Sequence, residues 1–360
     1  MTPSEKLELE ACLKRVGEIL YNNSDTESLE NLEDIETTVR EKLLEHVSPQ
    51  INLFFIEKNT GTKRGKKRTI KSCLGKLRIT QKQAEKLGIE PYTRYSPLLE
   101  KCCFLLSANE SYQNVEKDFV VLTGMTVSHS TSQRKVVKRK WELPDAKQRV
   151  SEISVDGGSI RLRSNKKGEK SFWKQYKTAR LQGIYYGAFY QDNLSLTDWI
   201  NSQKLTKPLY CLGDGHDGIW NIIAEIGEKK HRIEILDWYH LMENLHKIEA
   251  KKKDLLQLRA YLWFGQINET INYLNRLKPI GGNNFCNYLK KHQTKIINYH
   301  YFQWQKISSI GSGAVETAVK QINHRVQLPG AQWKEENVTQ ILQLRCSYLN
   351  GKFGIENLKN

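Results

Sequence analysis

The chain has 360 residues, enough for two or three compact units, and carries a formal net charge of +16 with a pI near 9.4. The first 50 residues hold 12 acidic and 5 basic side chains, a net charge of −7, which leaves +23 for the rest. We therefore expect a polyanionic partner. Seven cysteines without a C-x-x-C pair argue against a disulfide framework or zinc ribbon, and no apolar run reaches the about 18 residues of a membrane span. These features argue against a membrane-bound or disulfide-stapled protein and predict a cytoplasmic one.

The first segment, residues 1–60, is predicted to be helical, with two helices over residues 5–46. A basic segment follows from Gly61 to Thr80, with eight Lys or Arg and no acid. Its second half, Thr69 to Ile79 around Gly75, is predicted to be a hairpin. Its first half is interpreted either as a solvated loop or as a flexible arm that contacts DNA phosphates. The candidate contacts in this arm are Lys63, Arg64, Lys66, Lys67 and Arg68.

A helix-turn-helix is predicted within residues 61–150, which we treat as one DNA-binding region. Val115, Phe119 and Leu122 recur at helical spacing, Gly124 permits a tight turn, and a polar helix is expected to start near Ser128. The alternative is a helical hairpin that only packs on the core. The candidate DNA contacts on and after the second helix are Ser130, Gln133, Arg134, Lys138, Arg139 and Lys140, together with Arg161 and Arg163 farther on. His129 and Ser132 are also expected on this second helix, some of whose residues could reach base edges.

From Glu152 onward the pattern predicts strands. Three strands joined by turns are expected over 153–163, 173–182 and 183–191, then a helix, a strand over 207–214, a second helix and a strand over 231–237. About 65 residues without a strand signal follow, before the GSG sequence at 311–313. This order predicts an α/β chain with a ribonuclease H-like mixed sheet. We divide it into a first core part (151–237), an all-helical insertion (238–310) and carboxyl-terminal core helices (311–360), after the helical helix-turn-helix region.

Three acidic residues are candidates for a metal-binding triad. Asp156 in VDGG and Asp214 in LGDG are each expected at the end of a strand, before a sharp turn, and Glu316 in the first turn of a helix capped by Ser312. If the two strands are neighbours, the aspartates point into one cleft. Phosphodiester chemistry uses two divalent ions about 3.5 to 4 Å apart, and Mg²⁺ prefers carboxylate oxygens. The alternative is a purely structural role, in which the aspartates are turn residues and the glutamate complements the helix dipole.

Over roughly residues 110–351 the chain resembles the DDE transposases of bacterial insertion sequences, particularly the mutator-like, Kra-type branch with a helical insertion. The resemblance rests on SYQNVEKDFVVLTGMTVS, VDGGSIR, LGDGHDGIWN, ILDWYHLMENL, GSGAVETAVKQ and WKEENVTQILQLRCSYLNGKF. By motif position Asp156, Asp214 and Glu316 match the three family carboxylates, as catalytic residues and metal ligands. Asp237 and His240 match the D-x-x-H motif of this branch and are accessory candidates, with a buried structural pair as the alternative. For Trp333 the alternatives are core packing and stacking on a flipped base.

The resemblance implies a DNA transposase. Such an enzyme would bind the terminal inverted repeats of its element in double-stranded DNA, nick the element ends with two Mg²⁺ or Mn²⁺ ions, and join the freed 3′ hydroxyl to target DNA. It would act as a homodimer or a larger assembly on DNA. Two alternatives are a catalytically inactive, sequence-specific DNA-binding protein derived from such an element, and a nuclease of the same fold that cuts branched DNA without joining strands.

Overall fold

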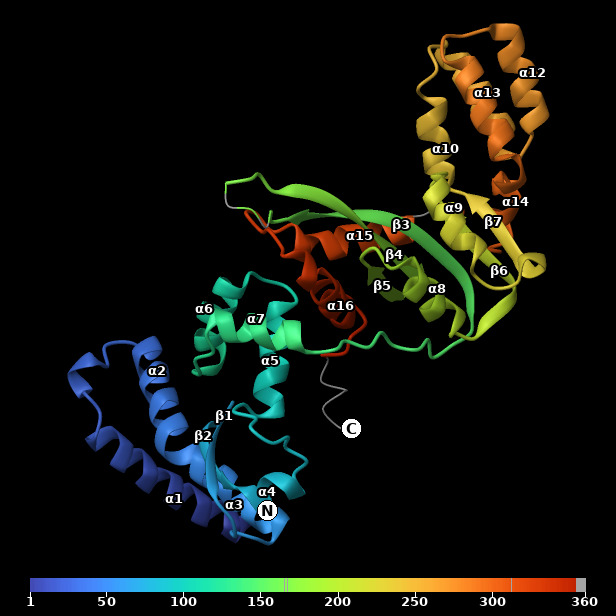
Figure 1. Cartoon of the computed structure of the whole chain (residues 1–360). Coiled ribbons are helices and arrows are strands. Elements are labelled where there is room, and N and C mark those ends of the chain that lie inside the picture. The colour runs from blue at the N-terminus through green and yellow to red at the C-terminus, as the bar shows by residue number, and fades with distance from the viewer. Residues whose placement is uncertain (165, 167, 312, 354–360) are drawn as a thin grey trace. The chain divides into compact units, whose positions relative to one another are not determined.

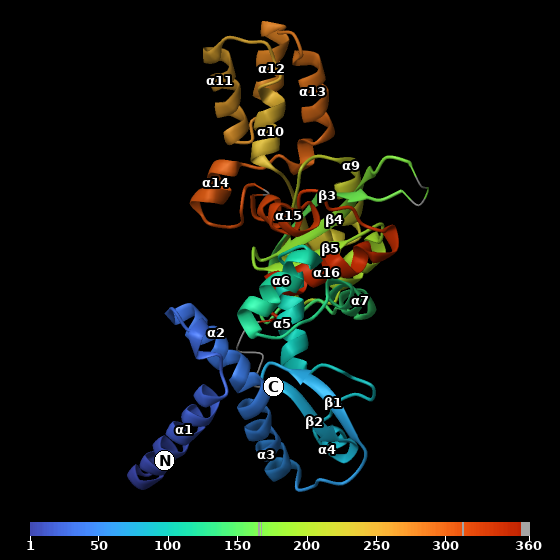
Figure 2. The same ribbon diagram turned by 90° about the vertical axis from the view of Figure 1, so that its left-hand side faces the viewer.

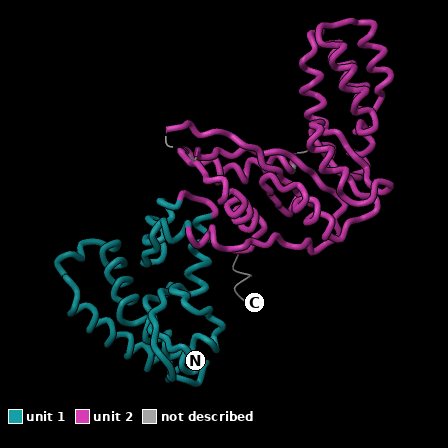
Figure 3. Tube along the Cα trace, in the orientation of Figure 1, with its two compact units in different colours: residues 1–107, 112–133 teal, residues 108–111, 134–360 magenta. Residues whose placement is uncertain are grey.

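The computed structural model describes residues 1–164, 166, 168–311 and 313–353. The chain forms two compact units, the first from residues 1–107 and 112–133 and the second from residues 108–111 and 134–360 (Figure 3). Ser312, which was expected to cap the helix that carries Glu316, lies outside the described residues. Within the described part of the chain, no helix combines the length and apolar character that a membrane crossing needs.

The first unit is mainly helical (Figures 1 and 2). Its helices are α1 (Pro3–Asn22), α2 (Leu32–Lys42), α3 (Ser48–Thr60), α4 (Gln81–Lys86), α5 (Pro97–Ser107) and α6 (Tyr112–Thr123), with short 3-10 and π turns at Thr26–Ser28 and Leu43–Val47. Helix α7 (His129–Lys138) starts in this unit and continues into the second. The N-terminal region therefore holds three helices, one more than the pattern predicted, because the chain continues as a helix from Ser48.

The predicted hairpin in the basic segment is confirmed. Strand β1 (Lys67–Ser72) pairs antiparallel with β2 (Gly75–Thr80), and Ser72 lies opposite Gly75 across the turn. Gly75 has a φ of +93°, and a Cβ there would lie 2.1 Å from the carbonyl oxygen of Leu44. Only glycine fits this position, because both the backbone conformation and the close approach exclude a side chain.

The predicted pair of helices with a tight turn is also present, as α6 and α7. Gly124 follows α6 with a φ of +68°, and α7 begins at His129, one residue after the predicted start. Val115 and Phe119 are buried as predicted, but Leu122 is 66% exposed. Leu122 follows Phe119 at helical spacing, yet the end of α6 extends past the small cluster on which Phe119 packs.

The second unit contains a five-stranded mixed sheet. Its strands are β3 (Val150–Leu162), β4 (Phe172–Leu181), β5 (Tyr185–Phe189), β6 (Leu205–Gly213) and β7 (Arg232–Leu236). They lie in the order β5-β4-β3-β6-β7 (Figure 1). The three strands β3, β4 and β5 form an antiparallel meander, whereas β6 and β7 run parallel to β3. The expected α/β class and mixed sheet are therefore confirmed.

Helices connect and cover the strands of this sheet. Helix α8 (Asn193–Asn201) and α9 (Asp217–Ala224) link the strands, with a 3-10 turn at Lys229–His231 before β7. The insertion consists of α10 (Trp238–Leu245), α11 (Lys252–Trp263), α12 (Ile267–Leu277), α13 (Gly282–Lys291) and α14 (Tyr299–Trp304), with a 3-10 turn at Gln293–Lys295. As predicted, it contains no strand among its described residues, and α10 to α13 lie side by side as a bundle (Figures 1 and 2).

After the insertion the chain returns to the sheet as α15 (Gly313–Val326), a 3-10 turn at Glu335–Asn337 and α16 (Val338–Leu349). Helix α15 packs on β3 and β4. Val315, Ile322 and Val326 are fully buried, as expected for the apolar stripe that docks this helix. Burial of this stripe fixes the face of α15 that packs on the sheet. It therefore also fixes the direction in which the other side chains of α15 point.

A close approach between β3 and β4 positions α15. The Tyr176 ring on β4 crosses Gly158 on β3, and its hydroxyl donates to Asn323 Oδ1 on α15 at 2.8 Å. A Cβ at Gly158 would lie 2.1 Å from Cζ of Tyr176. Gly158 therefore makes room for the side chain that anchors the helix carrying Glu316.

We expect Gly158→Ala to lower the free energy of unfolding by about 2 kcal/mol, since the fully buried Tyr176 ring has to move. Gly157→Ala is the matched control, because the nearest atom to its Cβ is the mobile end of Lys177 at 3.4 Å. Urea unfolding of both variants measures the difference. Equal stability of the two variants would contradict the steric role of Gly158.

Candidate metal centre

Two of the predicted ligands lie on neighbouring strands. Strands β3 and β6 are parallel with Ser154 opposite Leu212, so Asp156 and Asp214 each lie two residues farther along at the same level. The expectation that Asp156 ends its strand is wrong, because it lies inside β3, whose next residues still pair with β4. Strand β6, however, ends at Gly213. Asp156 therefore faces the point where its neighbouring strand stops, and the two aspartates still meet at one sheet edge.

The third strand of the parallel set adds another aspartate. Gly213 on β6 lies opposite Leu236 on β7, so Asp237 follows β7 at the level of Asp214. Asp237 is fully buried, and its Oδ1 accepts the backbone N–H of His240 at 2.8 Å as the N-cap of α10. Asp237 thus precedes the helix whose first turn carries His240.

Helix α15 brings Glu316 to the same place. Ligand atoms of Asp237, His240 and Glu316 all lie within 4.8 Å of one another. Asp156 and Asp214 do not belong to this closest set of described residues, although both interact electrostatically with it. Among the described residues, the set with ligand atoms this close therefore contains one member of the predicted triad, Glu316, and the two accessory candidates, Asp237 and His240. The parallel register places Asp237 at the level of Asp214.

Asp156 interacts electrostatically with Asp214, Glu316 and His240. Burial raises the pKa of Asp156 above its usual value, and the charges of Asp214 and Glu316 raise it further. The amide of Gly157 at 2.6 Å and the charge of His240 act in the opposite direction. The ionised form of Asp156 is therefore costly, and a bound cation would relieve that cost.

His240 supplies positive charge within the cluster. Its Nδ1 lies 3.4 Å from Asp237 Oδ1, close enough for an ion pair but without the alignment of a hydrogen bond. This contact with Asp237 is the main cause that raises the pKa of His240 to about 9, against the opposing effect of burial. At neutral pH the ring is therefore an imidazolium that offsets part of the surrounding negative charge.

The donor set fits a divalent cation. Asp156, Asp214 and Glu316 offer carboxylate oxygens, the ligands that Mg²⁺ prefers and that Mn²⁺ also accepts. Asp214 follows the end of β6 and is held by its own loop, because its Oδ1 accepts the N–H of His216 at 2.8 Å. A strand carries Asp156, a hydrogen-bonded loop carries Asp214 and a packed helix carries Glu316, and such support is what a preformed metal site needs.

Other residues near this centre have structural roles. Trp220 and Trp333 are buried, and Trp333 Nε1 donates to the Val326 carbonyl at 2.8 Å, which favours core packing over base stacking for Trp333. His216 caps α9, and Asp217 pairs with Lys291 at 2.7 Å. Sequence reasoning missed Tyr288, which reaches the loop of Asp214 from α13. Its only local signal was its place in an amphipathic helix, so tertiary structure alone reveals it.

The basic arm is exposed except at its last residue. Arg64, Lys66 and Lys67 are exposed, and Lys63 pairs with Glu57 at 2.6 Å. The half-buried Arg68 donates to the Glu90 carbonyl at 3.2 Å. A pocket of about 560 Å³ lies beside this arm, and its basic lining residues are Lys66, Lys67, Arg68 and Arg94.

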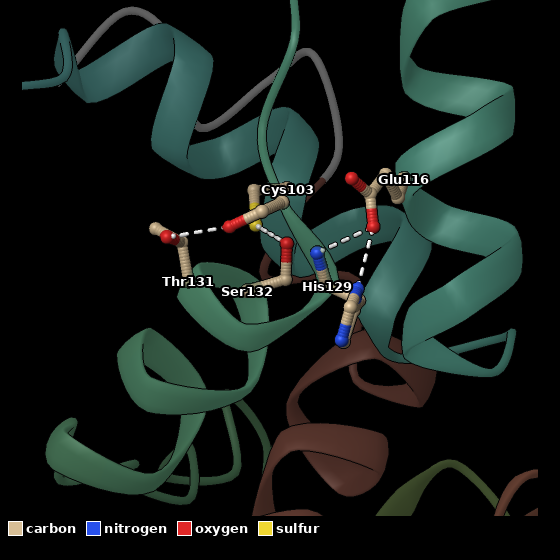
Figure 4. Close-up of polar contacts among 6 residues, drawn as sticks. Cys103, Glu116, His129, Thr131 and Ser132 are labelled. Carbon is tan, nitrogen blue, oxygen red and sulfur yellow. Dashed lines mark hydrogen bonds and ion pairs between the residues drawn. The ribbon is translucent and has the colours of Figure 1, made fainter.

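The start of α7 is engaged within its own unit (Figure 4). His129 Nδ1 lies 2.6 Å from Glu116 Oε2, and Cys103 Sγ donates to Ser132 Oγ at 3.3 Å. Ser132 lies on α7 as predicted but is fully buried, so it is not part of the exposed surface of this helix. The exposed candidates on and after α7 are Ser130, Gln133, Arg134, Lys138, Arg139 and Lys140.

The two remaining DNA candidates follow Ile160 near the end of β3. Arg163 is exposed, whereas Arg161 is half-buried and donates from Nε to Ser171 Oγ at 2.6 Å.

A search of protein-family models and of curated proteins found no match to this chain.

Proposed function

We propose that the chain is a DDE DNA transposase with a ribonuclease H-like catalytic core. The proposal is supported by the parallel register that puts Asp156 and Asp214 at one level, and by the electrostatic interaction of Asp156 with both Asp214 and Glu316, which lies 102 residues after Asp214. A strongly basic chain with such a carboxylate centre suits chemistry on a phosphodiester backbone.

The strand order supports the ribonuclease H-like assignment. Three antiparallel strands in sequence are followed by two strands parallel to the first, of which β6 lies beside β3 and β7 beside β6, and this is the order expected for that fold. The helical insertion between β7 and α15 agrees with the branch that the motifs resemble. Both features are supports for the proposal, which the experiments below test.

In this proposal the three carboxylates hold two Mg²⁺ ions beside the scissile phosphate. Bound ions of this kind lower the pKa of a water nucleophile and neutralise the attacking and leaving oxygens. Asp156 and Asp214 keep their separation because neighbouring strands carry them, and α15 sets the approach of Glu316. Asp237 orients His240, whose positive charge balances the cluster.

The DNA partner would lie against the exposed basic residues of the arm and of α7. Terminal inverted repeats and target DNA are the proposed ligands, and a homodimer or larger assembly would process both element ends in the cytoplasm at the nucleoid. Phosphate contacts of this kind give affinity that falls steeply with salt.

The test uses the DNA that flanks the reading frame as the source of the repeats. With Mg²⁺, the protein is expected to nick a labelled repeat at its end and to join the 3′ hydroxyl to a target plasmid. Repeat binding without any cleavage in Mg²⁺ or Mn²⁺ would support the inactive DNA-binding alternative instead. Cleavage of branched DNA without strand joining would support the nuclease alternative.

A charge variant tests the DNA-binding role of α7. Replacing Lys138, Arg139 and Lys140 with Ala should weaken DNA binding and reduce the slope of log K against log salt by about 2 to 3, since each lost phosphate contact removes about 0.9. Fluorescence anisotropy from about 50 to about 300 mM KCl measures this slope, since log K falls linearly with log salt over about that range. Lys251, Lys252 and Lys253, also exposed, provide the control triple variant. Equal changes in both variants would point to net charge alone.

A further inference from the structure

A tyrosine of the helical insertion lies against the loop of Asp214. Tyr288 is on α13, and a Cβ built at Gly215 would lie 2.8 Å from its hydroxyl oxygen. The hydroxyl therefore touches the backbone directly after Asp214. Burial, together with the charges of Asp214 and Asp237, raises the pKa of Tyr288 above its usual value. The hydroxyl thus stays protonated and is a donor at the edge of the carboxylate centre.

This donor has nothing to bond to in the described part of the chain. The Tyr288 hydroxyl is shielded from solvent and has no hydrogen-bond partner there. Leaving such a group unpaired costs about 1 to 3 kcal/mol, so buried hydroxyls in native proteins almost always have a partner. The acceptors that interact with it electrostatically are the carboxylates of Asp214 and Asp237.

Two side chains near Tyr288 also have a buried polar atom without a hydrogen-bond partner among the described residues. His292 is 2% exposed, and its ring centroid lies 4.7 Å from that of Tyr288 and 6.4 Å from that of Trp220. Neither His292 Nε2 nor Trp220 Nε1 has a partner among the described residues. Burial lowers the pKa of His292 to about 4, so its ring is neutral and adds no cation beside Asp214. Of these three side chains, Tyr288 is therefore the one whose polar group can interact with the carboxylates of the centre.

We propose that Tyr288 is a positioning residue for the metal centre and donates a hydrogen bond to the Asp214 carboxylate when a divalent cation binds. The inference rests on the metal site of the proposed function. One Asp214 oxygen already accepts the His216 amide, so a second donor would fix the carboxylate plane toward the cation. Donors that orient a ligating carboxylate typically change metal affinity by 10- to 100-fold.

The test compares Mn²⁺ binding by the full chain and by Tyr288→Phe, with free Mn²⁺ measured by electron paramagnetic resonance. We expect the Kd for Mn²⁺ to rise about 10-fold or more in the variant. Its midpoint of thermal unfolding should not fall, because the lost hydroxyl makes no bond in the described protein. A purely structural tyrosine would show the opposite pattern, a lower midpoint and an unchanged Kd.

Tyr273→Phe is the matched control. Its hydroxyl, also in the insertion, donates to Asp254 Oδ1 at 2.8 Å, so this variant should lose stability and keep the wild-type Kd. A wild-type Kd in Tyr288→Phe, or no Mn²⁺ binding by the unmodified protein, would overturn the inference. Because the readout needs no DNA, failure of strand cleavage with intact Mn²⁺ binding would count against the transposase and leave the role of Tyr288 standing.

Discussion

Asp156→Asn is expected to lower the rate of Mg²⁺-dependent strand cleavage by about 10³-fold or more. Losing one anionic ligand of a metal centre removes about 4 kcal/mol of transition-state stabilisation, and each 1.36 kcal/mol corresponds to about tenfold in rate. The same loss is expected for Asp214→Asn and for Glu316→Gln. Cleavage of a labelled inverted repeat under single-turnover conditions measures the rates.

The stability of Asp156→Asn should be retained or should rise, although its cleavage rate falls. Burial and the neighbouring carboxylates raise the pKa of Asp156, which means that the ionised form is disfavoured in the folded protein. A neutral amide of the same shape removes this repulsion, so the midpoint of thermal unfolding should stay equal or rise. Loss of activity together with retained stability distinguishes a site residue from a structural one.

Asp254→Asn provides the control, since Asp254 is a buried aspartate of α11 bonded to Tyr273. It should cleave DNA at the wild-type rate. Wild-type cleavage by Asp156→Asn, Asp214→Asn and Glu316→Gln would refute the assignment of the triad.

Arg345→Ala is expected to lower the free energy of unfolding of the second unit by about 4 kcal/mol. Arg345 is 3% exposed and donates to the Gln321 carbonyl at 2.9 Å, to the Ala108 carbonyl at 3.1 Å and to Asn109 Oδ1 at 2.6 Å. One guanidinium thus holds residues from α15, α16 and the 108–111 segment together. Its removal leaves buried acceptors unpaired, at a cost of about 1 to 3 kcal/mol each.

Urea unfolding followed by circular dichroism measures this loss. Arg259→Ala is the control, because Arg259 is exposed on α11, and its free energy of unfolding should change by less than about 0.5 kcal/mol. Arg345→Lys should remain destabilised, since a lysine ammonium cannot reproduce the planar fork of donors. A loss below about 1 kcal/mol in Arg345→Ala would show that the three acceptors find other partners.

Local patterns predicted most elements of the chain. The hairpin around Gly75, the two helices on either side of Gly124 and the strands of the sheet follow from apolar periodicity and glycine positions that act over a few residues. An error arose where a distant segment decides, since Asp156 does not end its strand because β4 continues to pair beyond it.

The sequence by itself determined the candidates Asp156, Asp214 and Glu316, the basic character of the chain and the order of its elements, because residue type and local spacing carry that information. Only the tertiary structure decided that Asp237 joins them and that Tyr288 reaches them from the insertion. The physical reason is that strand register and helix docking depend on pairing and packing between segments far apart in the chain. Each segment encodes its own apolar face, but the positions of Asp237 and Tyr288 depend on how those faces pack against one another.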